Sequence, residues 1–111
     1  MPIDRGLFPG ALEMMILQTV RREPLHGYEL AQVIKRNSRD LLQVEEGSLY
    51  PALQRMLKAG WLTAAWDVSA RNRKIRVYRI TPKGRKQLER TVSSFEQMLE
   101  GIAHAMKAAE S

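Results

Sequence analysis

Basic side chains gather in one short stretch of this 111-residue chain. Nine lysines and arginines and a single acid, Glu89, lie between residues 71 and 90, where the net charge is +8. Residues 1–70 carry eight basic and eight acidic side chains and residues 91–111 have a net charge of −2, so the formal net charge of +6 has its source in residues 71–90. A confined cation excess favours a surface that binds a polyanion, because each cation that meets a phosphate releases a counterion. A solvated charged face without a partner is the alternative.

Residues for covalent or metal chemistry are missing from the sequence. There is no cysteine, and the two histidines are His26 and His104, so neither a thiolate site nor a structural zinc site is expected. We expect His26 to be a cap or a packing residue, and Glu45-Glu46 to be an acidic helix start favoured by the helix dipole. No nucleophile–base pair or P-loop spacing is present. We therefore expect that the protein is not an enzyme and that it has no catalytic residue, metal or cofactor.

Two helices are predicted before the best-marked one. The first should open at Pro9-Gly10 and end at Glu23-Pro24, because a proline disfavours helix at the residue before it. The second should begin near Gly27-Tyr28, with an inner stripe formed by Leu30, Ala31 and Ile34. A mixed segment between Ser38 and Gly47 separates this helix from the next.

The third helix has the clearest signals. Ser48 is the expected N-cap, Pro51 is tolerable in the first turn, and Gly60 ends the helix. Helical spacing predicts a buried stripe of Leu49, Leu53, Met56 and Leu57. It places Pro51, Gln54, Arg55 and Lys58 on the opposite side.

A β-hairpin should follow, with strands at residues 61–66 and 74–81 joined by the polar turn of residues 67–73. Its tip and returning strand carry Arg71, Arg73, Lys74 and Arg76. We expect Trp61 and Trp66 to be core and sheet aromatics, and a role in stacking on a drug is the alternative.

The last helix should start at Thr81-Pro82, with Thr81 as its cap. Steps of four and three residues then connect Leu88, Val92, Phe95, Leu99, Ile102 and Met106. This is a heptad seam, which needs a partner, and we expect a homodimer built on it. Packing on the domain's own core is the alternative. A membrane-surface helix is disfavoured because the seam is narrower than a lipid-facing side.

This order of elements is that of a winged helix-turn-helix. The fold class is mainly α with a small β-hairpin, as a winged helix-turn-helix (residues 1–81) followed by a long C-terminal dimerisation helix (residues 82–111). The third helix would lie in the DNA major groove and the hairpin would touch the backbone or the minor groove. The residues expected to contact double-stranded DNA are Tyr28, Lys35, Ser48, Tyr50, Pro51, Gln54, Arg55, Lys58, Arg71, Arg73, Lys74 and Arg76.

The side-chain chemistry of two of these residues suggests which part of the DNA each would contact. Gln54 suits adenine, and Arg55 suits guanine or a phosphate. Alternatives stay open for three members: Arg55 could pair with an acid such as Glu46, and Tyr28 and Tyr50 could be packing residues. An interaction module that uses the winged scaffold to bind another protein is the alternative function.

Several motifs resemble the PadR family of bacterial transcriptional regulators. Residues 45–53 (EEGSLYPAL) are similar to that family's recognition-helix signature, and residues 26–28 (HGY) to the start of its second helix. Residues 60–62 (GWL) and 78–85 (YRITPKGR) resemble the two ends of its wing. The match is collinear from about Leu7 to Leu88.

The resemblance implies a dimeric repressor of a pseudo-palindromic operator, of the compact kind with one dimerisation helix. It also implies that a small aromatic or hydrophobic effector can act on the protein. The sequence departs from the family where Leu57 replaces a common Glu and Val77 replaces one member of a common Tyr pair. The last helix has no tryptophan, so an aromatic sandwich for flat drugs is not expected.

The expected location is the cytoplasm, with no membrane partner. The longest near-apolar stretch, Ala11 to Leu17, is too short to span a bilayer, and residues 1–10 contain no signal-peptide core.

Overall fold

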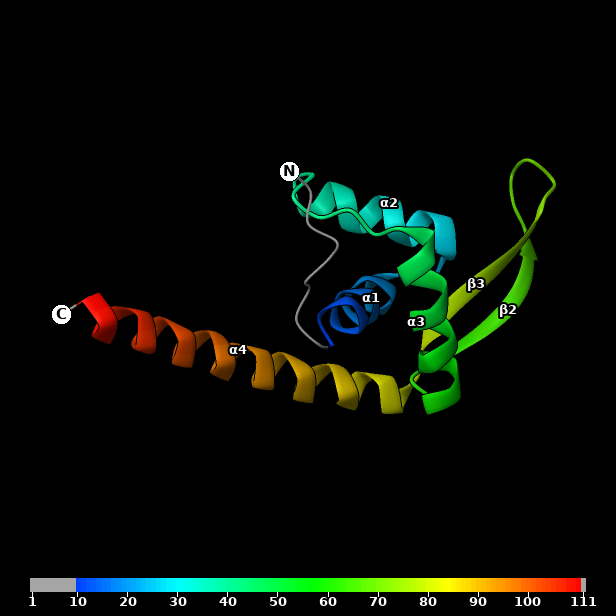
Figure 1. The fold of residues 1–111 in the computed structure, drawn as a ribbon. Coiled ribbons are helices and arrows are strands. Elements are labelled where there is room, and N and C mark those ends of the chain that lie inside the picture. Colours follow the sequence, from blue (N-terminus) through cyan, green and yellow to red (C-terminus); the bar gives the residue numbers. More distant parts are fainter. Residues whose placement is uncertain (1–9, 111) are drawn as a thin grey trace.

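A computed structural model describes residues 10–110 of the chain (Figure 1). The elements, in chain order, are α1 (Ala11–Arg22), β1 (Leu25–His26), α2 (Gly27–Asn37), α3 (Glu46–Ala59), β2 (Leu62–Val68), β3 (Lys74–Ile80) and α4 (Pro82–Glu110). The predicted fold class is confirmed: the chain is mainly helical, with a helix-turn-helix, a wing and a long last helix. Pro9, the expected opening of the first helix, lies outside the described residues.

The sheet has three antiparallel strands in the order β1-β3-β2, one more than the predicted hairpin. The additional strand, β1, pairs Leu25 with Tyr78 and His26 with Val77. The hairpin itself pairs β2 with β3 from Leu62–Ile80 at its base to Val68–Lys74 near its tip. Because β1 covers one edge of β3 near the base only, the outer part of the hairpin projects from the body as the wing (Figure 1).

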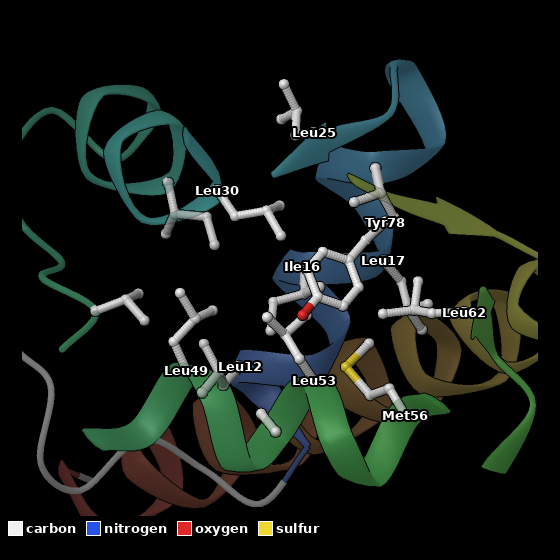
Figure 2. Close-up of a cluster of buried hydrophobic side chains, with 14 of the residues drawn as sticks. Leu12, Ile16, Leu17, Leu25, Leu30, Leu49, Leu53, Met56, Leu62 and Tyr78 are labelled. Atoms are coloured by element: carbon white, nitrogen blue, oxygen red, sulfur yellow. The ribbon is translucent and has the colours of Figure 1, made fainter. Parts of the chain in front are cut away.

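One apolar core joins the three N-terminal helices, the base of the sheet and the first turns of α4. Ile16 of α1, Leu30 of α2 and Leu53 of α3 have no exposed surface, and Tyr78 of β3 closes the core from the sheet side (Figure 2). The predicted inner stripe of α3 is confirmed for Leu49, Leu53 and Met56, whereas Leu57 is only partly buried. This packing fixes which side of α3 faces outward.

The start of α3 differs from the prediction. Glu45 occupies the N-cap position without a side-chain cap bond, and the helix begins at Glu46. Ser48 therefore is not the N-cap: it lies in the first turn, where its N–H donates to the carbonyl of Glu45 at 3.0 Å. The acidic pair at the positive end of the helix dipole favours the earlier start. Consequently Pro51 lies inside the helix, where it cannot donate to the carbonyl of Gly47.

The first turns of α4 are part of the domain. The hydroxyl oxygen of Thr81 accepts from the N–H of Gly84 at 2.9 Å, as predicted for the cap, and the hydroxyl donates to the carbonyl of Gly60 at 2.6 Å. A Cβ added at Gly84 would lie 2.2 Å from the carbonyl oxygen of Trp61, so only glycine allows this close approach. The helix axis is thereby held against the end of α3.

The packing of the first turns of α4 on the body divides the heptad seam into a buried part and an exposed part. Leu88 is 3% exposed and belongs to the core, so its assignment to a dimer interface is wrong, and Val92 packs on the same core. Beyond Met98 no described residue of the helix is buried, and α4 runs past the body (Figure 1). Leu99, Ile102 and Met106 are 46%, 43% and 62% exposed.

Candidate nucleic-acid interface

The outward side of α3 carries polar and basic side chains. Gln54 and Lys58 are exposed, as is Pro51 one turn before them. They lie opposite Leu53 and Met56, which the core holds. The predicted division of this helix into an inner stripe and an outer side is therefore found in the structure.

A groove of about 850 Å³ lies between the start of α2, the start of α3 and the wing. Its lining includes the four wing cations Arg71, Arg73, Lys74 and Arg76, together with Tyr28 and Tyr50. Six of the predicted contact residues thus come together although they derive from three separate segments. Among residues 10–110, none of the four cations forms an ion pair with a carboxylate.

The two tyrosines expose different amounts of surface. Tyr28 is 63% exposed, which excludes the alternative of core packing. Tyr50 is 42% exposed, and its ring lies against Gly27, where an added Cβ would be 3.0 Å from Cε1 and 3.2 Å from the hydroxyl oxygen. Tyr50 therefore both packs on the start of α2 and presents its surface to the groove.

A capping box fixes the start of α2. Nδ1 of His26 accepts from the N–H of Glu29, and Oε1 of Glu29 accepts from the N–H of His26, each at 3.4 Å. His26 is thus a cap, as expected. Glu29, which also lines the groove, is paired with His26 and, within residues 10–110, forms no ion pair with the wing cations.

Hydrogen bonds order the tip of the wing. The hydroxyl oxygen of Ser69 accepts from the N–H groups of Arg71 and Arg73, and the N–H of Ser69 donates to the carbonyl of Arg73 at 2.8 Å. Asn72 has a φ of 59°, a left-handed conformation that asparagine tolerates better than most residues. The turn therefore presents its arginines from a defined backbone.

Arg55 meets a different environment on the other flank of α3. Its Nη2 lies 2.7 Å from Oε1 of Glu13 in α1, so the pairing acid is Glu13 and not Glu46. Next to this ion pair, a cleft of about 430 Å³ between α1, α3 and α4 is bordered by Leu17 and Trp61. Arg55 is thus held on the side of α3 away from the wing.

Three other expectations change. Lys35 lies in the last turn of α2, at the end of that helix opposite Tyr28, and does not line the groove. Ser48 is half-buried and also lies outside the lining. Trp61 packs on the core as predicted, but Trp66 is 68% exposed, because it lies on the part of β2 that extends beyond the core.

Trp66 lies beside a wing cation, a pairing that the sequence analysis did not predict. The guanidinium carbon of Arg76 lies 5.9 Å from the centre of its ring. The signal was present in the sequence as an aromatic residue and a cation on the two hairpin strands, but only the register shows that they are directly opposite.

Tyr78 forms part of the groove and of the core at once. Burial raises the pKa of its hydroxyl, Arg76 opposes this rise and Tyr50 adds to it. Tyr78 therefore stays neutral and is a packing residue beneath the wing cations.

Neither a metal site nor a membrane-spanning helix is found within the described residues. They include no group of three or more histidine and acidic side chains arranged to hold a metal ion. No helix within residues 10–110 has the length and apolarity needed to cross a membrane.

Comparison with known proteins links this geometry to one family. Residues 16–90 match the model of the transcriptional regulator PadR-like family. A transcriptional regulator from Clostridium thermocellum has a TM-score of 0.78 and 26% identity, over 85% of this chain and 91% of that one. A PadR-like transcriptional regulator from Bacillus cereus strain ATCC 14579 has a TM-score of 0.73 and 32% identity, over 88% of this chain and 93% of that one. Bacillus subtilis PadR, solved in complex with operator DNA, shares the fold with a TM-score of 0.66 and 21% identity, over 73% of this chain and 45% of that one.

Proposed function

The chain belongs to the PadR-like family of transcriptional regulators, and from this premise we propose that it is a homodimeric repressor of a pseudo-palindromic operator. The family consists of regulators and not of enzymes, so the chain is a transcriptional regulator without a catalytic activity of its own. The cytoplasm is the location that this proposal requires.

One observation carries the proposal: the exposed side of α3 lies beside a groove whose four cations have no carboxylate partner among residues 10–110. An α-helix fits the major groove of DNA, where an amide such as that of Gln54 pairs with adenine. Cations on a neighbouring wing then bind phosphates, independently of sequence. The operator complex of Bacillus subtilis PadR supports this use of the fold, since that protein binds DNA.

The proposed contact set is smaller than the one expected from the sequence. It consists of Tyr28, Tyr50, Pro51, Gln54, Lys58, Arg71, Arg73, Lys74 and Arg76. Lys35 and Ser48 are left out because of their positions, and Arg55 because Glu13 already neutralises it.

The proposed dimer uses the distal part of α4. Leu99, Ile102 and Met106 continue the seam that Val92 and Phe95 begin, and each of the three exposes over two fifths of its surface. Burying such side chains against a second copy contributes about 25 cal/mol for each Å² of apolar surface removed from water. Two-fold symmetry would then present two α3 helices to successive major grooves about 34–36 Å apart.

The proposal includes release by a small aromatic or hydrophobic effector. The cleft of about 430 Å³ between α1, α3 and α4 supports it, because Ala59 and Trp61 offer partly exposed apolar surface beside the Arg55–Glu13 pair. A ligand there would contact α3 and α4 together. Thermal unfolding with a panel of planar phenolic acids tests this point: stabilisation together with loss of DNA binding supports it, and no shift with any ligand contradicts it.

A mobility-shift assay with DNA from the protein's own upstream region, and sedimentation at micromolar concentration, test the main proposal. We expect sequence-dependent binding and a dimer. Leu99→Asp with Ile102→Asp should yield monomers, whereas Gln97→Asp, on the opposite side of α4, should leave the dimer intact. Binding no tighter than to random DNA would favour a protein-interaction module, and a monomeric wild type would exclude the proposed dimer.

A further inference from the structure

Trp66 is a large aromatic residue exposed on the part of the wing that extends beyond the core. Its side chain is 68% exposed, although large aromatic residues are usually packed when a fold can bury them. In the strand register Trp66 lies directly opposite Arg76, and the guanidinium carbon of Arg76 is 5.9 Å from the ring centre. This distance is just inside the upper limit of about 6 Å for a cation–π interaction. The indole ring is therefore next to one of the groove cations.

Arg76 differs from the other three wing cations. Arg71, Arg73 and Lys74 are exposed, whereas Arg76 is partly buried in the groove wall. Its charge also acts on the hydroxyl of Tyr78, two residues along the same strand. The guanidinium thus lies near the ring of Trp66 and close enough to Tyr78 to influence the pKa of its hydroxyl. In the described part of the chain it has no carboxylate partner, so its charge is available to an external anion.

We propose that Trp66 is a positioning residue that holds the guanidinium of Arg76 in the groove, ready to bind a DNA phosphate. A guanidinium that lies on an aromatic ring uses its flat side, and its N–H donors remain available in its own plane. Restricting an arginine before binding lowers the conformational entropy that it loses on binding. The inference rests on the proposed function, because it assigns a role within DNA binding.

The other use of an exposed indole would be direct contact with DNA. The two uses differ in one measurable respect. A positioning residue acts only when Arg76 is present, whereas a contact residue acts with or without it. A double-mutant cycle separates them.

The experiment measures the dissociation constant for operator DNA by fluorescence anisotropy, with Trp66→Ala, Arg76→Ala and the double variant. We expect Trp66→Ala alone to weaken binding about two- to fivefold, the equivalent of an exposed cation–π pair. In the Arg76→Ala background it should have no further effect. A second cycle with Lys74→Ala should show independent effects that multiply. Thr63→Ala, an exposed position on the opposite side of β2, is the control and should leave affinity unchanged.

Two results would overturn the inference: an unchanged affinity of Trp66→Ala, or an equal loss in the Arg76→Ala background. If the wild type binds no DNA, the proposed function fails and this inference fails with it. Intact wild-type binding with an uncoupled cycle overturns the inference alone. Thermal unfolding of each variant excludes a folding defect, which the exposure of Trp66 makes unexpected.

A readout without DNA tests the contact itself. The ring current of Trp66 should shift the Nε–H signal of Arg76 upfield in the free protein, and Trp66→Leu should return it to the position of an unstacked arginine. An Arg76 signal that is the same in both proteins would show that the ring does not hold the guanidinium.

Discussion

The two flanks of α3 differ in how their charges are neutralised. On the flank that faces α1 and α4, Arg55 is paired with Glu13 at 2.7 Å, and Gly84 brings the backbone of α4 against Trp61. On the flank that faces the wing, the cations line a groove and lack carboxylate partners within residues 10–110. On the first flank the cation is neutralised by an acid of the same chain. On the second flank the cations are available to an external polyanion.

Because the two flanks differ in this way, substitutions on them should affect different properties of the protein. A substitution on the packed flank should change the free energy of unfolding, because its partners lie within the chain. A substitution on the open flank should change DNA binding and leave the free energy of unfolding nearly unaltered. The sequence shows that residues 71–90 are basic, but only the fold shows which of these cations line the groove beside α3.

The largest effect should come from removing Arg71, Arg73 and Lys74 together by substitution with alanine. The plot of log K against log salt has a negative slope, and its magnitude should decrease by about 0.9 for each phosphate that the variant no longer neutralises. This change should be the same on every DNA sequence. Arg73→Ala alone should show the same change in smaller measure. Titrations at several salt concentrations measure the slope.

The control for this prediction removes the same charge elsewhere. Arg21, Arg22 and Arg36 lie at the ends of α1 and α2 and do not line the groove. Their triple alanine variant should keep most of the slope. Equal losses in both triple variants would mean that net charge matters and the open flank does not.

Gly84→Ala should cost about 3 kcal/mol of unfolding free energy, the upper part of the range for overpacking, because the new Cβ meets the Trp61 carbonyl. Denaturant unfolding measures this loss. Gly101→Ala, which has nothing within 4 Å of its Cβ, is the matched control and should raise stability by about 1 kcal/mol. A Gly84→Ala protein as stable as the wild type would show that α4 is not held in this way.

Gln54→Ala should cost about 1–3 kcal/mol of binding free energy and relax the choice of base at one position of each half-site. Its stability should not change, since the side chain is exposed. Competition between operators with single-base changes measures the relaxation. Undiminished discrimination at every position would remove Gln54 from base reading.

Glu13→Gln should have the smallest effect. Arg55 is well exposed, so the pair with Glu13 should contribute at most about 1 kcal/mol to stability. DNA affinity should stay the same if Arg55 serves only the packed flank. A clear gain in affinity would instead show that Arg55, once released, binds DNA.

The arrangement of helices was predictable because it follows local patterns. Leucine and methionine spacing defined the inner side of α3, and Thr81-Pro82 marked the start of α4. The predicted start of α3 was wrong because two local signals for a helix start lie next to each other in the sequence. Ser48 had the chemistry of a cap, but the acidic pair before it starts the helix earlier.

Long-range contacts explain what the sequence did not reveal. The strand β1 has two residues and exists only by pairing with β3, some fifty positions later. Arg55 and Glu13 are 42 residues apart, so their ion pair has no local signal. Leu88 fits a heptad as well as Leu99 does, but the packing of the first turns of α4 on the body places Leu88 in the core.

The central claim is that the open flank of α3 and the wing read a two-fold symmetric site in duplex DNA. Selection of bound sequences from a pool of random duplexes tests it most directly. The account predicts an enriched palindromic motif with half-site centres about 10–10.5 base pairs, or a multiple of this, apart. A pool without enrichment, or a motif without two-fold symmetry, would contradict it.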